Sequence, residues 1–548
     1  MMTKKLLVPM LLVSCAMISH ESLVAEESDP AGITYEDLLQ GFSADSSRWA
    51  TFSGDYSGKR HSPLTQITPE NVDGLVPIWA FQSGTYARGR GFETTPLAYD
   101  DVLYVTGSNN FAWALDARTG RPFWEYQRNL PNDLTYGASA PVNRGFGMLG
   151  DRLFMVTLDA HLLAFDRHTG NILWDTTLAD YHVGYSATLA PLVIDGKVIT
   201  GISGGEYPTR GFVDAYDPDT GERIWRFYTV PGPGEPGSET WPDDPEIAAR
   251  GGGTTWMTGS YDPELDLLYW GTGNPNPDFY GDDRPGDNLY TASIVALEGA
   301  TGKLRWHYQF TPHDLYDWDS THVPVQAELL IDGEMRRVVM VANRNGFFYV
   351  LDRVTGELLL GKPFSETTWA REIGADGRPI VLNADGSQGC LPDMWGSTNF
   401  MPPSFNPALG LFFVNVRETC ATFISEKPEV IAPGQRSHGG SVFVDREKQY
   451  GALRAIDVAT GDREWEFLFP TPTVAGVMTT ASGLVFAGDA EGNFMAFDGE
   501  TGENLWHYQT GYAIHGAAAM THTLDGRQQV LIPSGSTLFA FALSDSEP

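Results

Sequence analysis

The chain has 548 residues, including 60 Gly and 35 Pro, and 42% of its residues are hydrophobic. This composition is ample for a core and is typical of an all-β protein with many turns. The formal net charge of −34 argues against a nucleic-acid-binding protein, because phosphate contacts need clustered Lys and Arg. Such a charge is compatible with a soluble protein outside the cytoplasm.

The N-terminus predicts export. Two lysines precede an apolar run from Leu6 to about Ile18, which is typical of a secretory signal and too short to remain as a membrane span. We expect cleavage after Ala25, so that residues 1–25 are a signal peptide and residues 26–548 form a single domain. The alternative is a lipoprotein box, Leu-Val-Ser-Cys, which would leave Cys15 lipidated. No other stretch is long and apolar enough to predict a transmembrane segment.

The three cysteines agree with export. Cys15 belongs to the signal, which leaves Cys390 and Cys420. In an oxidising compartment such a pair is expected to form a structural disulfide rather than a metal or catalytic site. The chain contains no Cys-x-x-Cys-His sequence, so no covalently attached c-type haem is expected on it.

One segment, AWALDARTGRPFW (Ala112–Trp124), is repeated along the chain. Further copies end at Trp174, Trp225, Trp306, Trp465 and Trp506. A seventh copy, VLDRVTGELLL (Val350–Leu360), keeps the turn and lacks the tryptophan. In each copy a β run ends at an acidic residue, Thr-Gly makes a tight turn, and a second β run carries a large side chain. One hairpin cannot bury its own faces, so the repeats are expected to stack on one another.

The spacing of the repeats indicates a propeller. The Thr-Gly turns lie at Thr119, Thr169, Thr220, Thr301, Thr355, Thr460 and Thr501. The shortest spacings match one four-stranded blade, which takes roughly 40–50 residues. The two widest gaps hold either long insertions or a blade without the signature, and Ile78–Phe81 is interpreted as an unpaired partner strand of the first blade. Together these features predict an all-β, eight-bladed β-propeller. A β-solenoid is the competing fold, but its repeats are shorter and need no Trp.

Three longer motifs carry a resemblance to a known family: GGGTTWMTGSYDPELDLLYWGTGNP, RPGDNLYTASIVALEGATGKLRWHYQFTPHDLYDWD and SGLVFAGDAEGNFMAFDGETG. With the repeats, they resemble the quinoprotein alcohol dehydrogenases over essentially the whole mature chain. Those enzymes are propellers with tryptophan-docking repeats, closed around a central site for pyrroloquinoline quinone (PQQ) and calcium. The resemblance implies a periplasmic PQQ- and calcium-dependent dehydrogenase. It would oxidise an alcohol to an aldehyde or ketone and pass electrons to an external acceptor, such as a soluble c-type cytochrome.

The resemblance implies two metal ligands in loops. Glu206, in SGGEYPTRG, resembles the calcium carboxylate of the family, and Asn274, in GTGNP, resembles its amide-oxygen ligand. Hard oxygen donors suit calcium, and oxygens of the cofactor would complete the shell. Taken alone, Glu206 is equally a solvated loop residue, and Asn274 a turn residue before Pro.

Asp319, in DWDS, resembles the catalytic aspartate and is also expected at the metal. Asp314 and Asp317 lie close by, and the Trp-Asp pairing is what selects Asp319 among the three. Two residues further on, Thr321 occupies the position where lanthanide-using relatives have a second aspartate. That difference favours calcium.

Trp256, in GGGTTW, resembles the tryptophan that forms the floor under the quinone, where an aromatic plane is suited to stacking. Most of the 15 tryptophans must nevertheless belong to blade cores. Arg344, in NRNG, resembles the arginine on the quinone oxygens, and Arg144, in VNRG, one that pairs with a carboxylate of PQQ. Other cofactor-contacting positions of the family fall on Glu93, Thr188, Ser203, Gly204, Gly205, Thr254 and Asn399.

The chain departs from the family in two places. Most members have an adjacent Cys-Cys pair just before VNRG, where this chain has Ala138 and Ser139. The common Trp-Gly-Gly-Val near the end is Val-Ala-Gly-Val here, beginning at Val474. Smaller groups would then cover one face of the cofactor, which favours a bulky or secondary alcohol over methanol.

Two other functions remain open at this point. A non-catalytic propeller scaffold of outer-membrane assembly uses similar repeats. The length of this chain and the joint presence of five residues argue against a scaffold, because a scaffold does not require them: Glu206, Asn274, Asp319, Trp256 and Arg344. A PQQ-dependent sugar or polyol dehydrogenase would share most of the same contacts. The sequence allows either a monomer or a homodimer.

Overall fold

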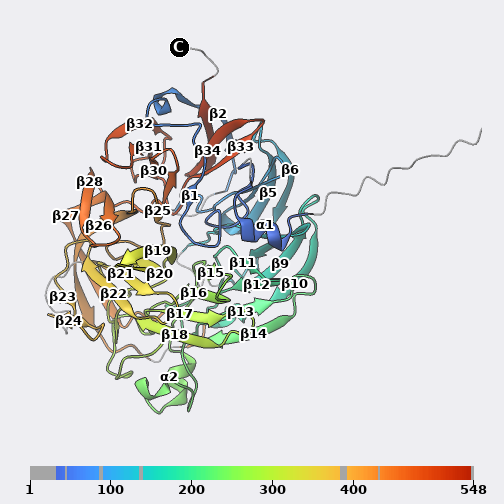
Figure 1. Cartoon of the computed structure of the whole chain (residues 1–548). Helices are drawn as coiled ribbons and strands as arrows, with labels where there is room; N and C mark the ends of the chain where they lie inside the picture. The colour runs from blue at the N-terminus through green and yellow to red at the C-terminus, as the bar shows by residue number, and fades with distance from the viewer. Residues whose placement is uncertain are drawn as a thin grey trace, which may run out of the picture.

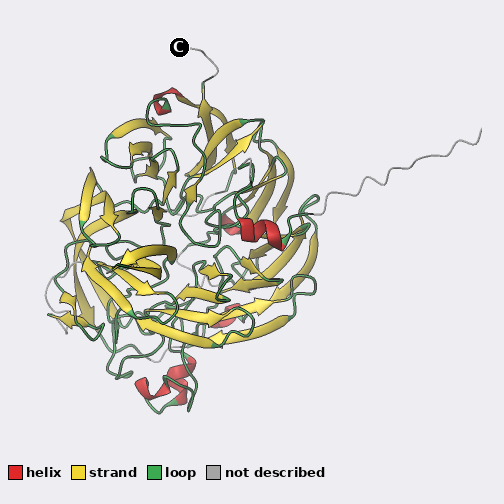
Figure 2. Cartoon of the chain, in the orientation of Figure 1, coloured by secondary structure: helices red, strands yellow, loops and turns green. Residues whose placement is uncertain are grey.

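The computed structural model describes residues 32–544, apart from residues 44–45, 86–89, 135–139, 332, 383–391 and 430–431. Eight antiparallel sheets are arranged around a central axis (Figures 1 and 2), which confirms the eight-bladed propeller. Each blade has four antiparallel strands in meander order, and one blade carries a short fifth strand. The helices are α1 (Tyr35–Gln40), with Thr34 as its N-cap, and α2 (Pro245–Ala249). Short 3₁₀ turns cover Val72–Gly74, Ser108–Asn110, Tyr181–Val183 and Ser238–Thr240.

The first four blades follow one another in the chain. Blade 1 contains β3 (Leu97–Tyr99), β4 (Val102–Thr106), β5 (Phe111–Asp116) and β6 (Pro122–Gln127). Blade 2 contains β7 (Gly147–Leu149), β8 (Arg152–Val156), β9 (His161–Asp166) and β10 (Ile172–Thr177). Blade 3 contains β11 (Leu192–Ile194), β12 (Lys197–Thr200), β13 (Phe212–Tyr216) and β14 (Arg223–Tyr228). Blade 4 contains β15 (Ser260–Asp262), β16 (Leu267–Gly271), β17 (Ser293–Glu298) and β18 (Leu304–Gln309).

The remaining blades complete the ring. Blade 5 contains β19 (Val325–Ile331), β20 (Glu334–Ala342), β21 (Phe347–Asp352) and β22 (Leu358–Pro363). Blade 6 contains β25 (Ser404–Asn406), β26 (Leu411–Ser425), β27 (Gly440–Asp457) and β28 (Arg463–Phe469). Blade 7 contains β29 (Val477–Thr480), β30 (Leu484–Gly488), β31 (Asn493–Asp498) and β32 (Asn504–Gln509), with β1 (His61–Ser62) added in parallel. Blade 8 contains β33 (Met520–Leu524), β34 (Arg527–Ser534), β35 (Thr537–Leu543) and β2 (Leu75–Gln82).

The ring is closed by its two ends. Strand β2 pairs with β35, so that Trp79 lies opposite Ala540. The assignment of Ile78–Phe81 to the first blade is therefore wrong, because this strand is the outer strand of the last blade. Pairing β2 with the last strand, β35, joins segments from near the two ends of the chain in one blade and closes the ring, while each blade keeps short edges, as propellers do.

Within the described residues, the two wide gaps between Thr-Gly turns hold insertions and no additional blade. The first gap contains α2 and the loops around it, between β14 and β15. The second contains the hairpin of β23 (Ala370–Ile373) and β24 (Pro379–Val381), followed by the long strands β26 and β27. Eight blades thus result from seven Thr-Gly turns and one blade closed by β2.

The repeated tryptophan joins neighbouring blades. The indole nitrogen of Trp124 donates to the carbonyl of Arg167 in the next blade, 2.8 Å away. Gly170 lies beneath the same ring at φ +72°, and a β-carbon there would stand 2.7 Å from it. Where the tryptophan is missing, Leu360 takes its place above Gly461. The Thr-Gly turn is therefore the docking surface for the preceding blade.

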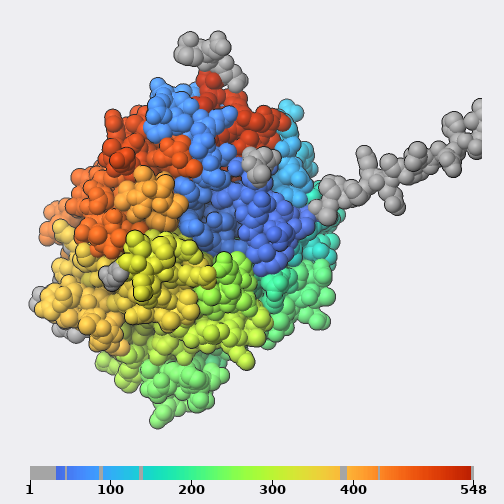
Figure 3. Space-filling view, in the orientation of Figure 1, coloured from blue at the N-terminus to red at the C-terminus, as the bar shows by residue number. Residues whose placement is uncertain are grey.

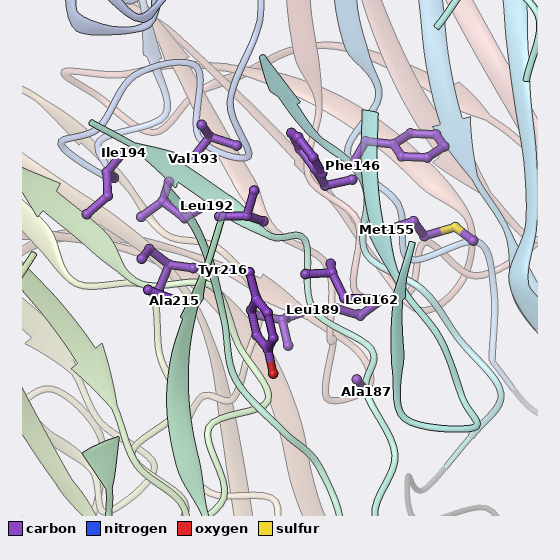
Figure 4. Close-up of a cluster of buried hydrophobic side chains, with 14 of the residues drawn as sticks. Phe146, Met155, Leu162, Ala187, Leu189, Leu192, Val193, Ile194, Ala215 and Tyr216 are labelled. Carbon is purple, nitrogen blue, oxygen red and sulfur yellow. The ribbon is translucent and has the colours of Figure 1, made fainter. Parts of the chain in front are cut away.

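The core lies between adjacent sheets. Figure 4 shows side chains of blade 2 and blade 3 meeting there, among them Phe146, Leu162, Leu192 and Tyr216, all of which are buried. Each sheet buries both faces against its neighbours, because the blades are packed around a full circle. No helix in the described part of the chain is long and apolar enough to cross a membrane.

The segment from Ile33 to Ser62 closes one end of the ring. Its backbone or side-chain groups bond to the first strand of every blade or to the residue that follows it, for example Trp49 to Ala98 in blade 1 and Ser57 to Gln326 in blade 5. In Figure 3 this blue segment covers the middle of the face shown. The predicted signal peptide and Cys15 lie outside the described residues.

Candidate active site

The candidate active site is a pocket built from loops at one end of the blades. These loops either lead into the first strand of a blade, as at Thr188 and Trp256, or follow its second strand, as at Glu206 and Asn274. The two kinds of loop meet at the same end, because neighbouring strands are antiparallel. The pocket holds about 700 Å³ of space, with its opening to solvent included.

The structure brings almost all of the predicted site residues into this pocket. The predicted residues that line it are Arg144, Thr188, Ser203, Gly204, Gly205, Glu206, Thr254, Trp256, Asn274, Asp319, Arg344 and Asn399. Glu93 does not line the pocket and lies behind it. The lining residues not predicted from sequence are Arg90, Ala140, Val142, Asp317, Met394, Trp395 and Phe400.

Asp319 is held by three hydrogen-bond donors. Its Oδ2 accepts from Nη2 of Arg344 at 2.7 Å and from the indole nitrogen of Trp256 at 3.1 Å. Its Oδ1 accepts from the backbone N–H of Asn274 at 2.8 Å. Gly273 is required beside it, because a β-carbon there would stand 2.5 Å from Oδ1. These bonds fix the position of the carboxylate.

Asp317 lines the same pocket with much less support. Its carboxylate lies 3.8 Å from Nη1 of Arg344, while its backbone carbonyl accepts from that nitrogen at 2.6 Å. Burial raises the pKa of Asp317 well above the ordinary value, and the nearby carboxylates, Asp278 foremost, add to the rise against the opposing charge of Arg344. Asp317 adopts φ +61°, so the alternation of side chains along an extended segment could not have predicted that it faces the pocket.

Glu206 and Asn274 lie next to one another across Gly205. A β-carbon on Gly205 would stand 3.1 Å from Oδ1 of Asn274. Burial raises the pKa of Glu206, and Asp278 and Asp319 add to this effect against the opposing charge of Arg436. Among the described residues, no basic side chain forms an ion pair with Glu206. Glu206 therefore lies near other carboxylates without a basic partner of its own among the described residues.

The donor set fits a cation that takes oxygen ligands. In the described part of the chain, no three His, Cys, Asp or Glu side chains are grouped so that they alone could hold a metal. An ion here would therefore need the amide oxygen of Asn274 beside the carboxylates, together with oxygens from a bound molecule. Such oxygen-rich, mixed coordination is what hard cations accept.

A second charged cluster supports Arg144. Nη2 of Arg144 lies 2.8 Å from Glu93, and its Nη1 donates to Thr188 at 2.6 Å. Burial alone would raise the pKa of Glu93, but Arg144, then His515 and Arg90, outweigh it and bring the pKa to about 2. Nε of Arg144 is buried without a hydrogen-bond partner among the described residues, so the guanidinium still has a donor for a bound anion.

Aromatic rings complete the pocket. Trp256 and Phe400 meet edge to face, and the guanidinium of Arg144 lies 5.1 Å from the Trp256 ring. Trp395 lies against Arg90, whose guanidinium is 4.8 Å from the ring centre. Val474 and Ala475 are buried and do not line the pocket. Their smaller size therefore does not by itself enlarge it.

Two predicted features fall on residues that the structure does not describe. Ala138 and Ser139 lie outside the described residues, as does Cys390. Cys420 is half-buried on β26, opposite Asp445. The disulfide between Cys390 and Cys420 stays a prediction.

Comparison with known proteins identifies the family of this chain. The family model described as glucose/ethanol/alcohol dehydrogenase, beta-propeller domain, matches residues 49–370, and the model of outer membrane protein assembly factor BamB matches residues 424–547. Quinoprotein alcohol dehydrogenase PedH of Pseudomonas putida is 35% identical, covering 95% of this chain and 89% of the relative.

Solved structures of dehydrogenases of this kind superpose on the chain. Quinohemoprotein alcohol dehydrogenase ADHIIG of Pseudomonas putida superposes with a TM-score of 0.89 at 34% identity, covering 95% of this chain and 83% of that one. A europium-containing methanol dehydrogenase superposes at 0.86 with 31% identity, covering 93% and 100%. The fold, the pocket and these relatives together show that the chain belongs to the PQQ-dependent quinoprotein alcohol dehydrogenases.

Proposed function

We propose that this alcohol dehydrogenase acts in the periplasm, holds PQQ and a metal ion in the central pocket, and passes electrons to an external acceptor such as a soluble c-type cytochrome. The observation that carries the proposal is the meeting of an aromatic ring, buried arginines and side-chain oxygens that could bind a metal in one pocket. Trp256, Arg144, Arg344, Glu206 and Asn274 supply these elements. A propeller scaffold would not need such a pocket.

The residues present fit PQQ, a flat molecule with three carboxylates. Trp256 offers a plane for stacking, and Arg144 offers a buried guanidinium nitrogen that lacks a partner among the described residues. Thr188 and Ser203 line the same pocket, and their hydroxyl oxygens lie 3.4 Å apart. Glu93 would position Arg144 from behind, with its own charge balanced by the arginine.

The metal would be held by Glu206, Asn274 and Asp319. Bound PQQ would supply the hydride acceptor, and the ion a Lewis acid for its quinone oxygen. Arg344 would orient the same end of the cofactor, since it already fixes Asp319. Metal and cofactor are expected to bind together, because the side chains alone are an incomplete shell.

The proton acceptor is better assigned to Asp317 than to Asp319. Both oxygens of Asp319 accept hydrogen bonds from fixed donors, which hold the carboxylate in one position, as a metal ligand requires. Asp317 lies in the pocket, and its carboxylate accepts no hydrogen bond from the described residues. A general base needs a free lone pair in reach of the substrate hydroxyl. We therefore propose that Asp317 takes the proton of the alcohol while Asp319 supports the metal.

This assignment changes the expected ion. The preference for calcium depended on Thr321, counted two residues beyond Asp319. Counted from Asp317, the second aspartate of lanthanide-using relatives is Asp319 itself. Asp319 would then add a carboxylate to a shell that also contains Glu206 and Asn274, and an added carboxylate favours a trivalent over a divalent cation. We propose a lanthanide, with calcium as the alternative, and note that one structural relative contains europium.

The substrate is proposed to be a bulky or secondary alcohol. Support comes from the absence of a Cys-Cys pair and from the apolar side chains of Val142, Met394 and Phe400 in the lining. A polyol or sugar would need hydroxyl partners among these groups. A PQQ-dependent sugar or polyol dehydrogenase is therefore the second candidate, and the two differ in the rank order of substrates.

The test uses purified, metal-stripped protein. PQQ would be added alone, with calcium chloride, or with lanthanum chloride, and reduction of an artificial dye followed with methanol, ethanol, a secondary cyclic alcohol and a sugar. We expect turnover only with PQQ and metal together, with more from lanthanum than from calcium, and with the cyclic alcohol preferred. Strict preference for methanol would refute the substrate assignment. Absence of PQQ binding would refute the whole proposal and favour the scaffold.

A further inference from the structure

Behind the metal side of the pocket, a buried carboxylate determines which way the amide of Asn274 faces. Nδ2 of Asn274 donates to Oδ1 of Asp278 at 2.8 Å and to the carbonyl of Pro275 at 3.2 Å. Both partners are acceptors, so they must face the NH₂ group. The amide oxygen of Asn274 is consequently turned toward Gly205 and the pocket, where an ion needs it.

Asp278 is itself held by a histidine from another blade. Nδ1 of His438 donates to Oδ2 of Asp278 at 2.5 Å. The Asp278 side chain is fully buried, whereas 37% of the His438 side chain is exposed. Since the two oxygens of Asp278 face Asn274 and His438, and Asp278 does not line the pocket, it is not a metal ligand.

His438 belongs to the segment 432–439, here called the strap, which leads into β27 of blade 6. The strap also bonds to the loop that carries Glu206, because the backbone N–H of Ser437 donates to the Glu206 carbonyl at 2.8 Å. The carbonyl of His438 accepts from Phe279 at 2.8 Å. One segment of blade 6 thus bonds to the metal-side loops of blades 3 and 4.

The strap packs closely against the loop that contains Asp278. A β-carbon on Gly439 would stand 2.7 Å from Cβ of Tyr280, and Gly439 adopts φ +66°. The ring of His438 lies nearly parallel to that of Phe279, with centroids 6.1 Å apart. Asn276 bridges the loops by donating to the carbonyl of Gly205 at 2.9 Å. These contacts fix the histidine relative to Asp278.

We infer that Asp278 and His438 are positioning residues for the metal, which hold the amide oxygen of Asn274 toward the ion and couple docking of the strap to metal binding. The inference rests on the proposed function and adds residues to which that proposal gives no role. Partners behind a metal ligand typically change metal affinity by about 10–100-fold when removed.

The chain supplies conservative variants and a matched control. Asp278→Ala removes the acceptor for Asn274, whereas Asp278→Asn keeps an oxygen there. His438→Ala removes the donor, whereas His438→Asn retains an N–H near the position of Nδ1. His161 forms a similar pair with Asp175, 2.6 Å apart, on blade 2 and outside the pocket lining. His161→Ala therefore controls for loss of a surface histidine–aspartate pair.

The experiment titrates lanthanum chloride and calcium chloride into metal-free protein saturated with PQQ, by calorimetry. We expect Asp278→Ala and His438→Ala to raise the metal Kd at least tenfold, and both asparagine variants and His161→Ala to stay within about threefold of wild type. Hydrogen exchange of residues 432–439 should slow on metal binding in the wild type and change much less in His438→Ala. His438 is half-exposed, so this variant keeps the test available if Asp278→Ala fails to fold.

Wild-type affinity in both alanine variants would overturn the inference, as would an Asp278→Asn protein as weak as Asp278→Ala. A wild-type protein that binds PQQ but no metal would test the proposed function and not the positioning role alone. It would refute the proposed metal site first, and the positioning role with it.

Discussion

The indole nitrogen of Trp256 donates a hydrogen bond to Oδ2 of Asp319, 3.1 Å away. This bond joins the aromatic floor of the pocket to the carboxylate that Arg344 also holds. The same ring lies 5.1 Å from the guanidinium of Arg144. The surfaces expected to meet the cofactor and the metal are therefore parts of one rigid assembly.

Trp256→Phe separates stacking from this hydrogen bond. Phenylalanine keeps an aromatic plane and lacks the N–H, so we expect PQQ affinity to fall only slightly. Metal affinity should fall about tenfold, because a hydrogen bond to a charged group contributes about 1.5–3 kcal/mol. Calorimetric titration of PQQ and of metal into each variant checks this, with Trp256→Ala losing both. Equal loss of PQQ affinity in the two variants would contradict the role of the ring as a floor.

Replacing the two aspartates separately tests the division of roles. Asp317→Asn should keep PQQ and metal while turnover falls by about 10²–10⁴-fold, the usual contribution of a general base. Asp319→Asn should weaken lanthanum binding more than calcium binding, because it removes one negative charge from the proposed shell. Dye-reduction rates together with metal titrations distinguish the two. Normal turnover in Asp317→Asn, with turnover lost in Asp319→Asn at full metal load, would return the base to Asp319.

Acid should lower the unfolding free energy of the apoprotein, because Glu93 becomes protonated. The folded state holds its pKa at about 2, below the ordinary value near 4.5, so the stabilisation is complete above pH 4.5. It is lost as the pH falls from 4.5 toward 2. The difference in unfolding free energy between wild type and Glu93→Gln, about 3 kcal/mol near pH 6, should therefore shrink by pH 3. Urea unfolding across this range measures it, and a constant difference would contradict the ionised Glu93.

The docking of tryptophan on the Thr-Gly turn can be tested with two glycines. Gly170→Ala introduces a β-carbon 2.7 Å from the Trp124 ring at a position with φ +72°. Gly196 has a similar φ of +66° and no atom within 4 Å of the added carbon. We expect about 1 kcal/mol of destabilisation in Gly196→Ala, from the backbone alone, and clearly more in Gly170→Ala. Equal urea midpoints would mean that the ring adapts without cost.

The repeat pattern was sufficient to predict the propeller because it is a local feature. Each copy of the repeat contains one hairpin with its turn and the side chain that packs on the turn of the next blade. Trp124, which packs on Gly170 of the next copy, is an example. The assignment of Ile78–Phe81 failed because ring closure pairs segments from opposite ends of the chain. Nothing near β2 in the sequence indicates β35 as its partner.

The site was predicted in part. The motifs around Glu206, Asn274 and Trp256 are long enough to carry a resemblance, and these residues do meet in one pocket. Asp317 was passed over because three aspartates stand within six positions, and only the hydrogen bonds of the folded chain distinguish them. His438 had no signal at all, since it comes from another blade.

Repeats and contiguous motifs were sufficient to predict the eight blades, the family and most of the pocket lining, because they encode local structure directly. The tertiary structure decided which strand closes the ring, which carboxylate is held by donors and which is left free, and that His438 stands behind Asn274. Those relationships join residues far apart in the chain or choose among equivalent neighbours. They depend on distances and hydrogen bonds that exist only once the blades have packed.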